Sequence, residues 1–410
     1  MIGKKPDKAL WDATLYYAAL ILNIFLGWVV AKFNTTYLDL ADYGRYSFFI
    51  IVLYFSRSFF GFGFFESTSR LLAVTPDTSG RKELLGTGIL FTLGFIILFS
   101  LFFILAALFS DNIFNVKIGD LCSYYALIAS VILFHSFYLL AIRGTGQIEL
   151  LSILTVSPRI FYLLLMALII FLNQFTLIQS LNMFFLAMGL VIILITLYLK
   201  PSFKNWKSTA HRLWQELKSY GIHLYLSTIW NEILFHADKF VVSYFLSAQS
   251  MAYYALGYAL TFPLSHFSTS IATTMFNRFA LQSRISFRVI RVNIIFVIAS
   301  VLVFIFLRRI IIVNLFSMEY LPTVDIMLPL ALAFGFSGLS KPFTLFLMAR
   351  GDGKRVRNIS VLVPTVHIIA GILIVPYYGI LGAAWTAAGI YFLDLLLFLL
   401  AYRKFIRIQF

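Results

Sequence analysis

Four basic residues stand inside long apolar runs of this chain, where they could bind an anion. They are Arg57, Arg159, Lys239 and Lys341. A cation at the centre of a bilayer costs about 2.5–3.5 kcal/mol even on the most lenient scale, so such residues usually face a protein interior or a wet cavity. There, guanidinium and ammonium groups suit phosphate oxygens. The alternative for each is snorkelling or a structural ion pair, which is strongest for Lys239 and Lys341 because Asp238 or a span end is close.

The apolar run around Lys239 also carries other titratable groups. Glu232, His236, Lys239 and Ser243 recur at the spacing that places side chains on one face of a helix. A carboxylate and an imidazole one turn apart inside a membrane could form a proton relay, with Asp238 as a further candidate. They could equally be a satisfied structural pair, and the sequence leaves both open.

A second polar stripe begins at His266 and is rich in hydroxyl and amide groups. Such groups suit a sugar, although hydrogen bonding between neighbouring helices is the more ordinary explanation. The stripe consists of His266, Thr269, Ser270, Thr273 and Asn277.

A repeated spacing links the two halves of the chain. "RGTG" at Arg143 and "RGDG" at Arg350 are 207 residues apart, and Arg70 and Arg278 are 208 apart. We therefore predict two lobes related by duplication, with a central, mainly cationic cavity between them. Near this offset, polar residues pair as Arg57 with His266, Arg159 with His367, His135 with Lys341, and Lys32 with Lys239.

The composition determines the class of protein that positions these residues. The 410 residues are 61% hydrophobic and only 12% charged, whereas a soluble domain is about half apolar and a quarter charged. Apolar runs of about 20 residues, the length of a membrane-spanning helix, recur along the chain. We predict an all-α polytopic membrane protein with about twelve transmembrane helices. The expected spans are 12–33, 42–69, 84–109, 118–142, 148–172, 176–199, 219–246, 250–278, 287–315, 323–349, 358–376 and 380–402.

Basic residues set the expected orientation. If the N-terminus is cytoplasmic, 23 of the 32 Lys and Arg residues fall on the cytoplasmic side, as the positive-inside rule requires. Both termini are then inside, and the first run is long enough to remain as a span rather than act as a cleaved signal.

The segment between the predicted lobes, "FKNWKSTAHRLWQELK", has the apolar spacing of an amphipathic helix at the membrane surface. The expected domains are 1–202, a connector at 203–218, and 219–410. The two RGxG pieces are expected to be cytoplasmic turns, because glycine commonly ends a helix. "GDGK" lacks the spacing and preceding strand of a phosphate-binding loop.

Several function classes are disfavoured. The sequence lacks common hydrolase and zinc-protease motifs, its six histidines are dispersed, and it has one cysteine, so we expect neither enzyme activity nor a metal site. The net charge of +15 is spread over short loops, which favours insertion topology over nucleic-acid binding.

Five motifs carry a family resemblance. They are "LADYGRYSFF" at 40–49, "GFGFFESTSRLLA" at 61–73, the aspartate Asp238, "SAQSMAYYALGYAL" at 247–260 and "GILGAAWTAA" at 379–388. In order and spacing the chain resembles Wzx-type polysaccharide (O-antigen) flippases of the MOP exporter superfamily, which also contains MATE drug exporters and lipid II flippases.

The resemblance implies a two-lobed, V-shaped protein of the bacterial inner membrane. It would carry an undecaprenyl-pyrophosphate-linked oligosaccharide from the cytoplasmic to the periplasmic leaflet by alternating access. Membrane lipid and the polysaccharide polymerase and chain-length machinery are the other partners it suggests. We expect no cofactor, with proton or sodium coupling left open. A MATE-like exporter of organic cations is the main alternative, and it is disfavoured because it would prefer an acidic cavity.

Overall fold

The computed structural model describes residues 8–409, and every regular element in that range is helical. This confirms the all-α class predicted from the apolar runs. The helices are α1 (Lys8–Tyr37), α2 (Leu40–Arg57), α3 (Phe64–Val74), α4 (Thr78–Ile113), α5 (Gly119–Tyr124), α6 (Val131–Thr145), α7 (Ile148–Phe171), α8 (Leu177–Leu199), α9 (Trp206–Glu216), α10 (Ile222–Phe245), α11 (Ala248–Thr261), α12 (His266–Thr274), α13 (Phe276–Leu281), α14 (Phe287–Leu315), α15 (Thr323–Ala349) and α16 (Gly353–Gln409).

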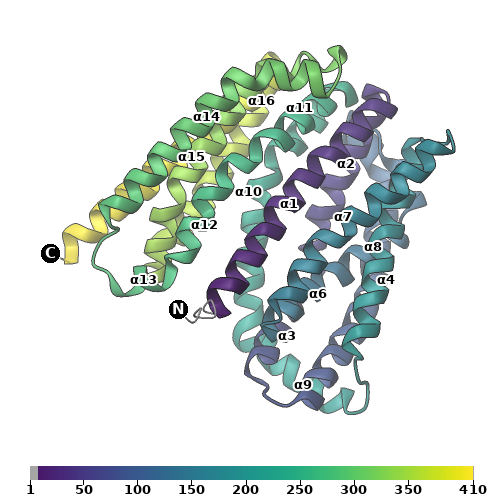
Figure 1. Ribbon diagram of the computed structural model, residues 1–410, viewed down its shortest axis with the longest axis vertical. Coiled ribbons are helices and arrows are strands. Elements are labelled where there is room, and N and C mark those ends of the chain that lie inside the picture. The colour runs from purple at the N-terminus through teal and green to yellow at the C-terminus, as the bar shows by residue number, and fades with distance from the viewer. Residues whose placement is uncertain (1–7, 410) are drawn as a thin grey trace, which may run out of the picture. The chain divides into compact units, whose positions relative to one another are not determined.

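The described chain packs as two compact units (Figure 1). The N-terminal unit holds residues 8–38, 49–113 and 117–232, and the C-terminal unit holds 39–48, 114–116 and 233–409. The division therefore falls within α10. The amphipathic helix predicted between the lobes is present as α9, and it packs on α3 and α4 of the N-terminal unit. The twofold duplication and its boundaries remain a prediction.

Eight described helices are long and apolar enough to cross a membrane, and one of them, α16, contains two predicted spans joined at a kink at Gly379. The protein is a multi-pass membrane protein. The three predicted spans that fall short of this criterion are 42–69, 219–246 and 250–278, which carry Arg57, the Asp238–Lys239 pair and His266. These three spans are more polar or more interrupted than the others, and they carry several of the candidate site residues.

Each unit has its own buried core, with apolar side chains left exposed on the outer helices. In the N-terminal unit the ring of Phe49 contacts those of Phe103, Tyr125 and Phe185, from three other segments. In the C-terminal unit α15 packs against α11, α12, α14 and α16 (Figure 1). Phe306 on α14 is 78% exposed, as expected of a side chain that faces lipid rather than water.

The two RGxG pieces both end helices, as predicted, but with different glycines. In the first, Gly146 adopts the left-handed conformation after α6; in the second, Gly351 does so after α15. Gly144, the counterpart of Gly351, stays helical. A Cβ atom on Gly144 would lie 2.2 Å from the backbone oxygen of Ser69, so α6 requires a glycine there to approach α3.

This close approach gives a stability prediction. We expect Gly144→Ala to lower the free energy of unfolding by about 1–3 kcal/mol, because the added methyl overpacks against backbone that cannot turn aside. Gly353→Ala is the matched control, since nothing lies within 4 Å of its Cβ position. Thermal unfolding of the purified variants in detergent measures both. Equal melting temperatures for the two variants would contradict the prediction.

Candidate functional site

The C-terminal unit contains a buried ion pair between neighbouring residues of α10. Asp238 and Lys239 are 7% and 3% exposed, and the Lys239 ammonium lies 3.1 Å from the Asp238 carboxylate. Burying an unpaired charge in a membrane protein is costly, so the two charges stabilise each other. Of the alternatives given for Lys239 in the sequence analysis, the structure shows the ion pair, and the partner is the neighbouring Asp238.

Both partners of this pair have additional bonds. The Tyr254 hydroxyl on α11 donates to the second Asp238 oxygen at 2.6 Å. The Lys239 ammonium donates to the Phe235 carbonyl at 2.6 Å. It also lies 3.5 Å from the centroid of the Tyr258 ring and 4.9 Å from that of Phe235. Lys239 thus occupies an aromatic cage of the kind that stabilises ammonium groups.

Three predicted histidines lie in the same unit as this pair. His367 on α16 is 2% exposed and close enough to Asp238 and Lys239 to interact electrostatically with both. His236, one turn before Lys239, is also buried. His266 is partly buried at the start of α12, its ring 4.6 Å from that of Phe262. The structure therefore brings His367 to the ion pair although 129 residues separate it from Asp238.

A second carboxylate that was not predicted, Asp394, lies partly buried in the last span of α16. Asp394 accepts a hydrogen bond from the Ser340 hydroxyl on α15 at 2.7 Å, and Lys341 interacts with it electrostatically. Lys341 thus lies beside an acid, as Lys239 does. Asp394 could have been found from the sequence, because it is the one charged residue in the predicted span 380–402.

The N-terminal unit holds the two predicted arginines and His135. Arg57 ends α2, where its guanidinium lies 4.7 Å from the Tyr54 ring centroid and 3.4 Å from the Ser136 hydroxyl of α6. It forms no ion pair with a carboxylate in residues 8–409. Arg159 on α7 donates to the backbone carbonyl of Asn23 on α1. Both guanidinium groups act electrostatically on His135, so these three predicted residues lie in one region of the N-terminal unit, which we call the N-terminal cluster.

Arg57 and His266 each lie next to a break in a helix, which follows Arg57 and precedes His266. The chain turns at residues 58–63 between α2 and α3, where Phe62 and Gly63 have positive φ. It forms a short 3-10 turn, Phe262–Ser265, just before His266. Where a helix breaks inside a membrane protein, the freed backbone N–H and C=O groups need hydrogen-bond partners.

Glu232 lies in the part of α10 that belongs to the N-terminal unit.

The described residues contain no group of three or more His, Cys, Asp and Glu side chains arranged to hold a metal ion. The N-terminal cluster offers guanidinium groups to an anion. The C-terminal unit offers the buried Asp238 and the partly buried Asp394, which interact with Lys239 and Lys341.

The structure resembles several solved membrane transporters. Lipid II flippase MurJ in an inward closed conformation matches with a TM-score of 0.74 and 16% identity, over 95% of this chain and 87% of that one. A multidrug resistance MATE family transporter of the MOP superfamily, facing inward, gives 0.70 and 14%, over 99% and 96%. A MOP superfamily transporter from Pyrococcus furiosus gives 0.60 and 13%, over 97% and 94%.

These likenesses establish the fold, which is that of MOP superfamily transporters. No curated protein sequence matches this chain significantly. A family model described as "Polysaccharide biosynthesis protein" matches residues 10–282, more than half of the chain. The chain is therefore a multi-pass member of the polysaccharide biosynthesis protein family, built on the fold of the MOP superfamily.

Proposed function

We propose that this protein is a Wzx-type flippase, a transporter rather than an enzyme. Its substrate is an undecaprenyl-pyrophosphate-linked oligosaccharide, an O-antigen or related polysaccharide repeat unit, and it moves this lipid from the cytoplasmic to the periplasmic leaflet. The observation that carries the proposal is the N-terminal cluster of Arg57, Arg159 and His135, which lies within the helical part of a polysaccharide biosynthesis protein. A lipid pyrophosphate is an anion that such a protein would meet within the membrane.

In this proposal the arginines bind the pyrophosphate, and the polar stripe that begins at His266 forms hydrogen bonds with the sugars. Arg57 is available for this, since its described partners are neutral groups, a hydroxyl and an aromatic ring. Its guanidinium fork matches two phosphate oxygens at once. Lys239 is held by Asp238 and Lys341 lies near Asp394, so these lysines have a secondary role in binding. The lipid tail stays in the bilayer while the glycan crosses.

The membrane potential supplies part of the driving force. A potential that is negative inside favours outward movement of an anion by about 2.3 kcal/mol per charge per 100 mV. Coupling to a proton or a sodium ion could add to this, and Asp238, Glu232, His236 and His367 are the residues we propose for it. The polysaccharide polymerase and the chain-length machinery are the proposed partners on the periplasmic side of the inner membrane, with both termini in the cytoplasm.

Deletion and complementation test this function. We expect cells that lack the gene to lose surface polysaccharide and to accumulate the undecaprenyl-linked repeat unit, measured by mass spectrometry of extracted lipids. Expression of the protein should reverse both effects. The MATE-like alternative predicts instead unchanged surface glycan and increased sensitivity to organic cations, so a drug-susceptibility panel on the same strains separates the two functions.

A further inference from the structure

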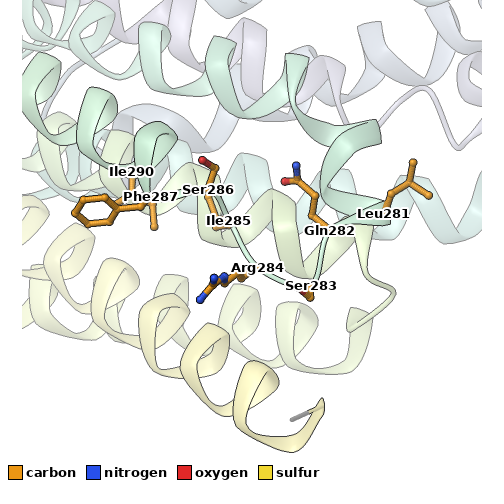
Figure 2. Close-up of a pocket in the computed structure, with 8 residues that line it drawn as sticks. All are labelled: Leu281, Gln282, Ser283, Arg284, Ile285, Ser286, Phe287 and Ile290. Atoms are coloured by element: carbon orange, nitrogen blue, oxygen red, sulfur yellow. The ribbon is translucent and has the colours of Figure 1, made fainter.

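The loop between α13 and α14 borders a cavity at one end of the C-terminal unit. The cavity has a volume of about 730 Å³, and Figure 2 shows its lining residues along the loop and the first turn of α14. The lining consists of Leu281, Gln282, Ser283, Arg284, Ile285, Ser286, Phe287 and Ile290. A volume of this size accommodates a small polar ligand or headgroup.

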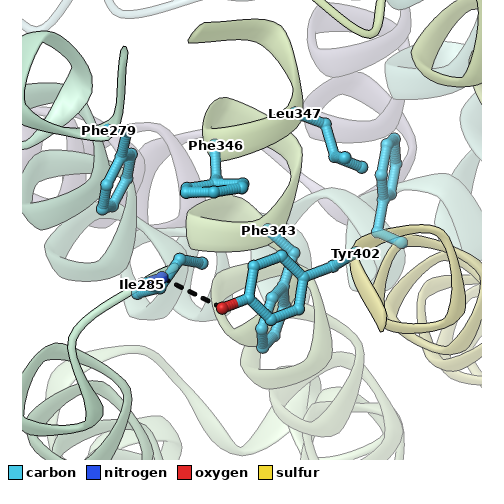
Figure 3. Packing of buried hydrophobic residues seen from close by; sticks show 7 residues of the cluster. Phe279, Ile285, Phe343, Phe346, Leu347 and Tyr402 are labelled. Atoms are coloured by element: carbon cyan, nitrogen blue, oxygen red, sulfur yellow. Dashed lines mark hydrogen bonds between the residues drawn. The ribbon is translucent and has the colours of Figure 1, made fainter. Parts of the chain in front are cut away.

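The end of α16 is fixed beside this loop. The backbone amide of Ile285 donates to the Tyr402 hydroxyl at 3.0 Å (Figure 3). Phe279, Ile285 and Tyr402 belong to one buried cluster that also includes Phe346 and Phe398. The loop thus rests on a rigid core, and the charges of α16 are held near it.

Positive charge is concentrated at this end of the unit. Seven exposed basic residues stand on the two segments 276–291 and 395–409, which contain no aspartate or glutamate. We call them the basic end: Arg278, Arg284, Arg288, Arg291, Arg403, Lys404 and Arg407. Arg284 itself lines the cavity.

The basic end lies where one candidate membrane span begins and another ends. One candidate span starts at Phe287 and another ends at Arg407. Beside the cavity, Leu281 and Phe287 are 87% and 68% exposed, and the Arg291 guanidinium lies 4.7 Å from the Phe287 ring centroid. Exposed apolar side chains next to arginines at a span end match the boundary between acyl chains and headgroups.

We propose that the cavity at the basic end binds the phosphate headgroup of an anionic phospholipid of the surrounding leaflet. Arg284, which lines the cavity, contacts the phosphate. Arg288, on the next turn, adds to the positive potential, and Leu281 and Phe287 contact the upper acyl chains. The exposed apolar residues favour a lipid over a soluble phosphate, which would gain nothing from them. The inference concerns the membrane around the protein and does not depend on which substrate it transports.

Native mass spectrometry of the purified protein with added phosphatidylglycerol tests the site. We expect phosphatidylglycerol to bind the unaltered protein and phosphatidylcholine to bind much more weakly. The Arg284→Gln/Arg288→Gln variant should bind phosphatidylglycerol more than tenfold more weakly, since each basic residue near a membrane surface strengthens the attraction about fivefold. Arg308→Gln/Arg309→Gln is the matched control, because it removes two charges from the other end of α14.

Several results would overturn the proposal. They are equal weakening in both variants, unchanged binding in Arg284→Gln/Arg288→Gln, and equal binding of the two phospholipids. Two competitors identify other occupants. If inorganic phosphate displaces phosphatidylglycerol at constant ionic strength, the ligand is a soluble anion; if undecaprenyl phosphate displaces it at lower concentration, the ligand is the transported lipid. Elution volume and helix content show that each variant is folded.

Discussion

Replacing Asp238 with alanine is expected to destabilise the protein by about 3–5 kcal/mol, because it leaves a buried ammonium without its carboxylate. Lys239 is 3% exposed and could not reach water without breaking its contacts with Phe235 and Tyr258. The Tyr254 hydroxyl would lose its acceptor as well. The loss should appear as a marked fall in the melting temperature of the detergent-purified variant. Glu319→Ala, an exposed carboxylate of the same unit, is the control and should change little.

A double variant separates the charge effect from packing. Replacing both partners of a buried ion pair with apolar side chains is often nearly neutral, so Asp238→Ala/Lys239→Met should recover most of the lost stability. If the double variant is as unstable as Asp238→Ala, the Lys239 charge is not the cause, and the explanation by an unpaired ammonium fails.

The same double variant distinguishes the two roles that the sequence left open for this region. If the pair is structural, recovery of stability should be accompanied by recovery of surface glycan in the complementation assay. If Asp238 couples transport to a proton or a sodium ion, the double variant should be stable but inactive. The Lys239 ammonium lies against Asp238 in the structure, so coupling through Asp238 would require the coupling cation to displace Lys239.

The fold class could be predicted from the sequence because membrane insertion constrains the length and composition of each span. A span must be about 20 residues long and apolar, and that constraint predicted the long apolar helices, including the two that meet at Gly379 within α16. What the apolar pattern could not predict is where a span breaks. The interruption of α2 at residues 58–63 depends on local backbone conformations at Phe62 and Gly63, and a glycine-rich stretch predicts them only loosely.

The sequence indicates which buried or partly buried polar residues are candidates for a site, but it does not show which of them contact one another. The cost of burying charge identified Arg57, Arg159 and Lys239 from single positions. Which group lies against which depends on helix packing, so the contact of Tyr254 with Asp238 left no sequence signal. Asp394 differs in this respect, because a lone carboxylate in an apolar span is as costly as a lone cation and its position alone marks it as a candidate. His367 and Asp238 are far apart in the sequence, so nothing in the sequence predicts that they lie close together.

The strongest expected effect on transport comes from the N-terminal cluster. We expect Arg57→Gln/Arg159→Gln to reduce surface glycan and flipping of the lipid-linked repeat unit by at least a hundredfold. A hydrogen bond to a charged group contributes about 1.5–3 kcal/mol, so losing two such contacts with a pyrophosphate corresponds to a factor of between about one hundred and about twenty thousand. Surface glycan is measured by gel staining, and flipping by protection of the labelled repeat unit from an external reagent.

Replacing the arginines with lysine shows whether their paired N–H donors are needed or only their positive charge. Arg57→Lys/Arg159→Lys keeps both positive charges but loses the planar pair of donors, so we expect partial activity, well above that of the glutamine variant. Arg45→Gln, on the same helix as Arg57 but in a surface pair with Asp42, controls for the general loss of a positive charge and should remain active. Arg159 also holds α1 through the Asn23 carbonyl, so insertion and melting temperature must be measured for every variant. A glutamine variant that is folded and fully active would show that neither arginine binds the transported anion, and the proposed function would then lose the observation that carries it.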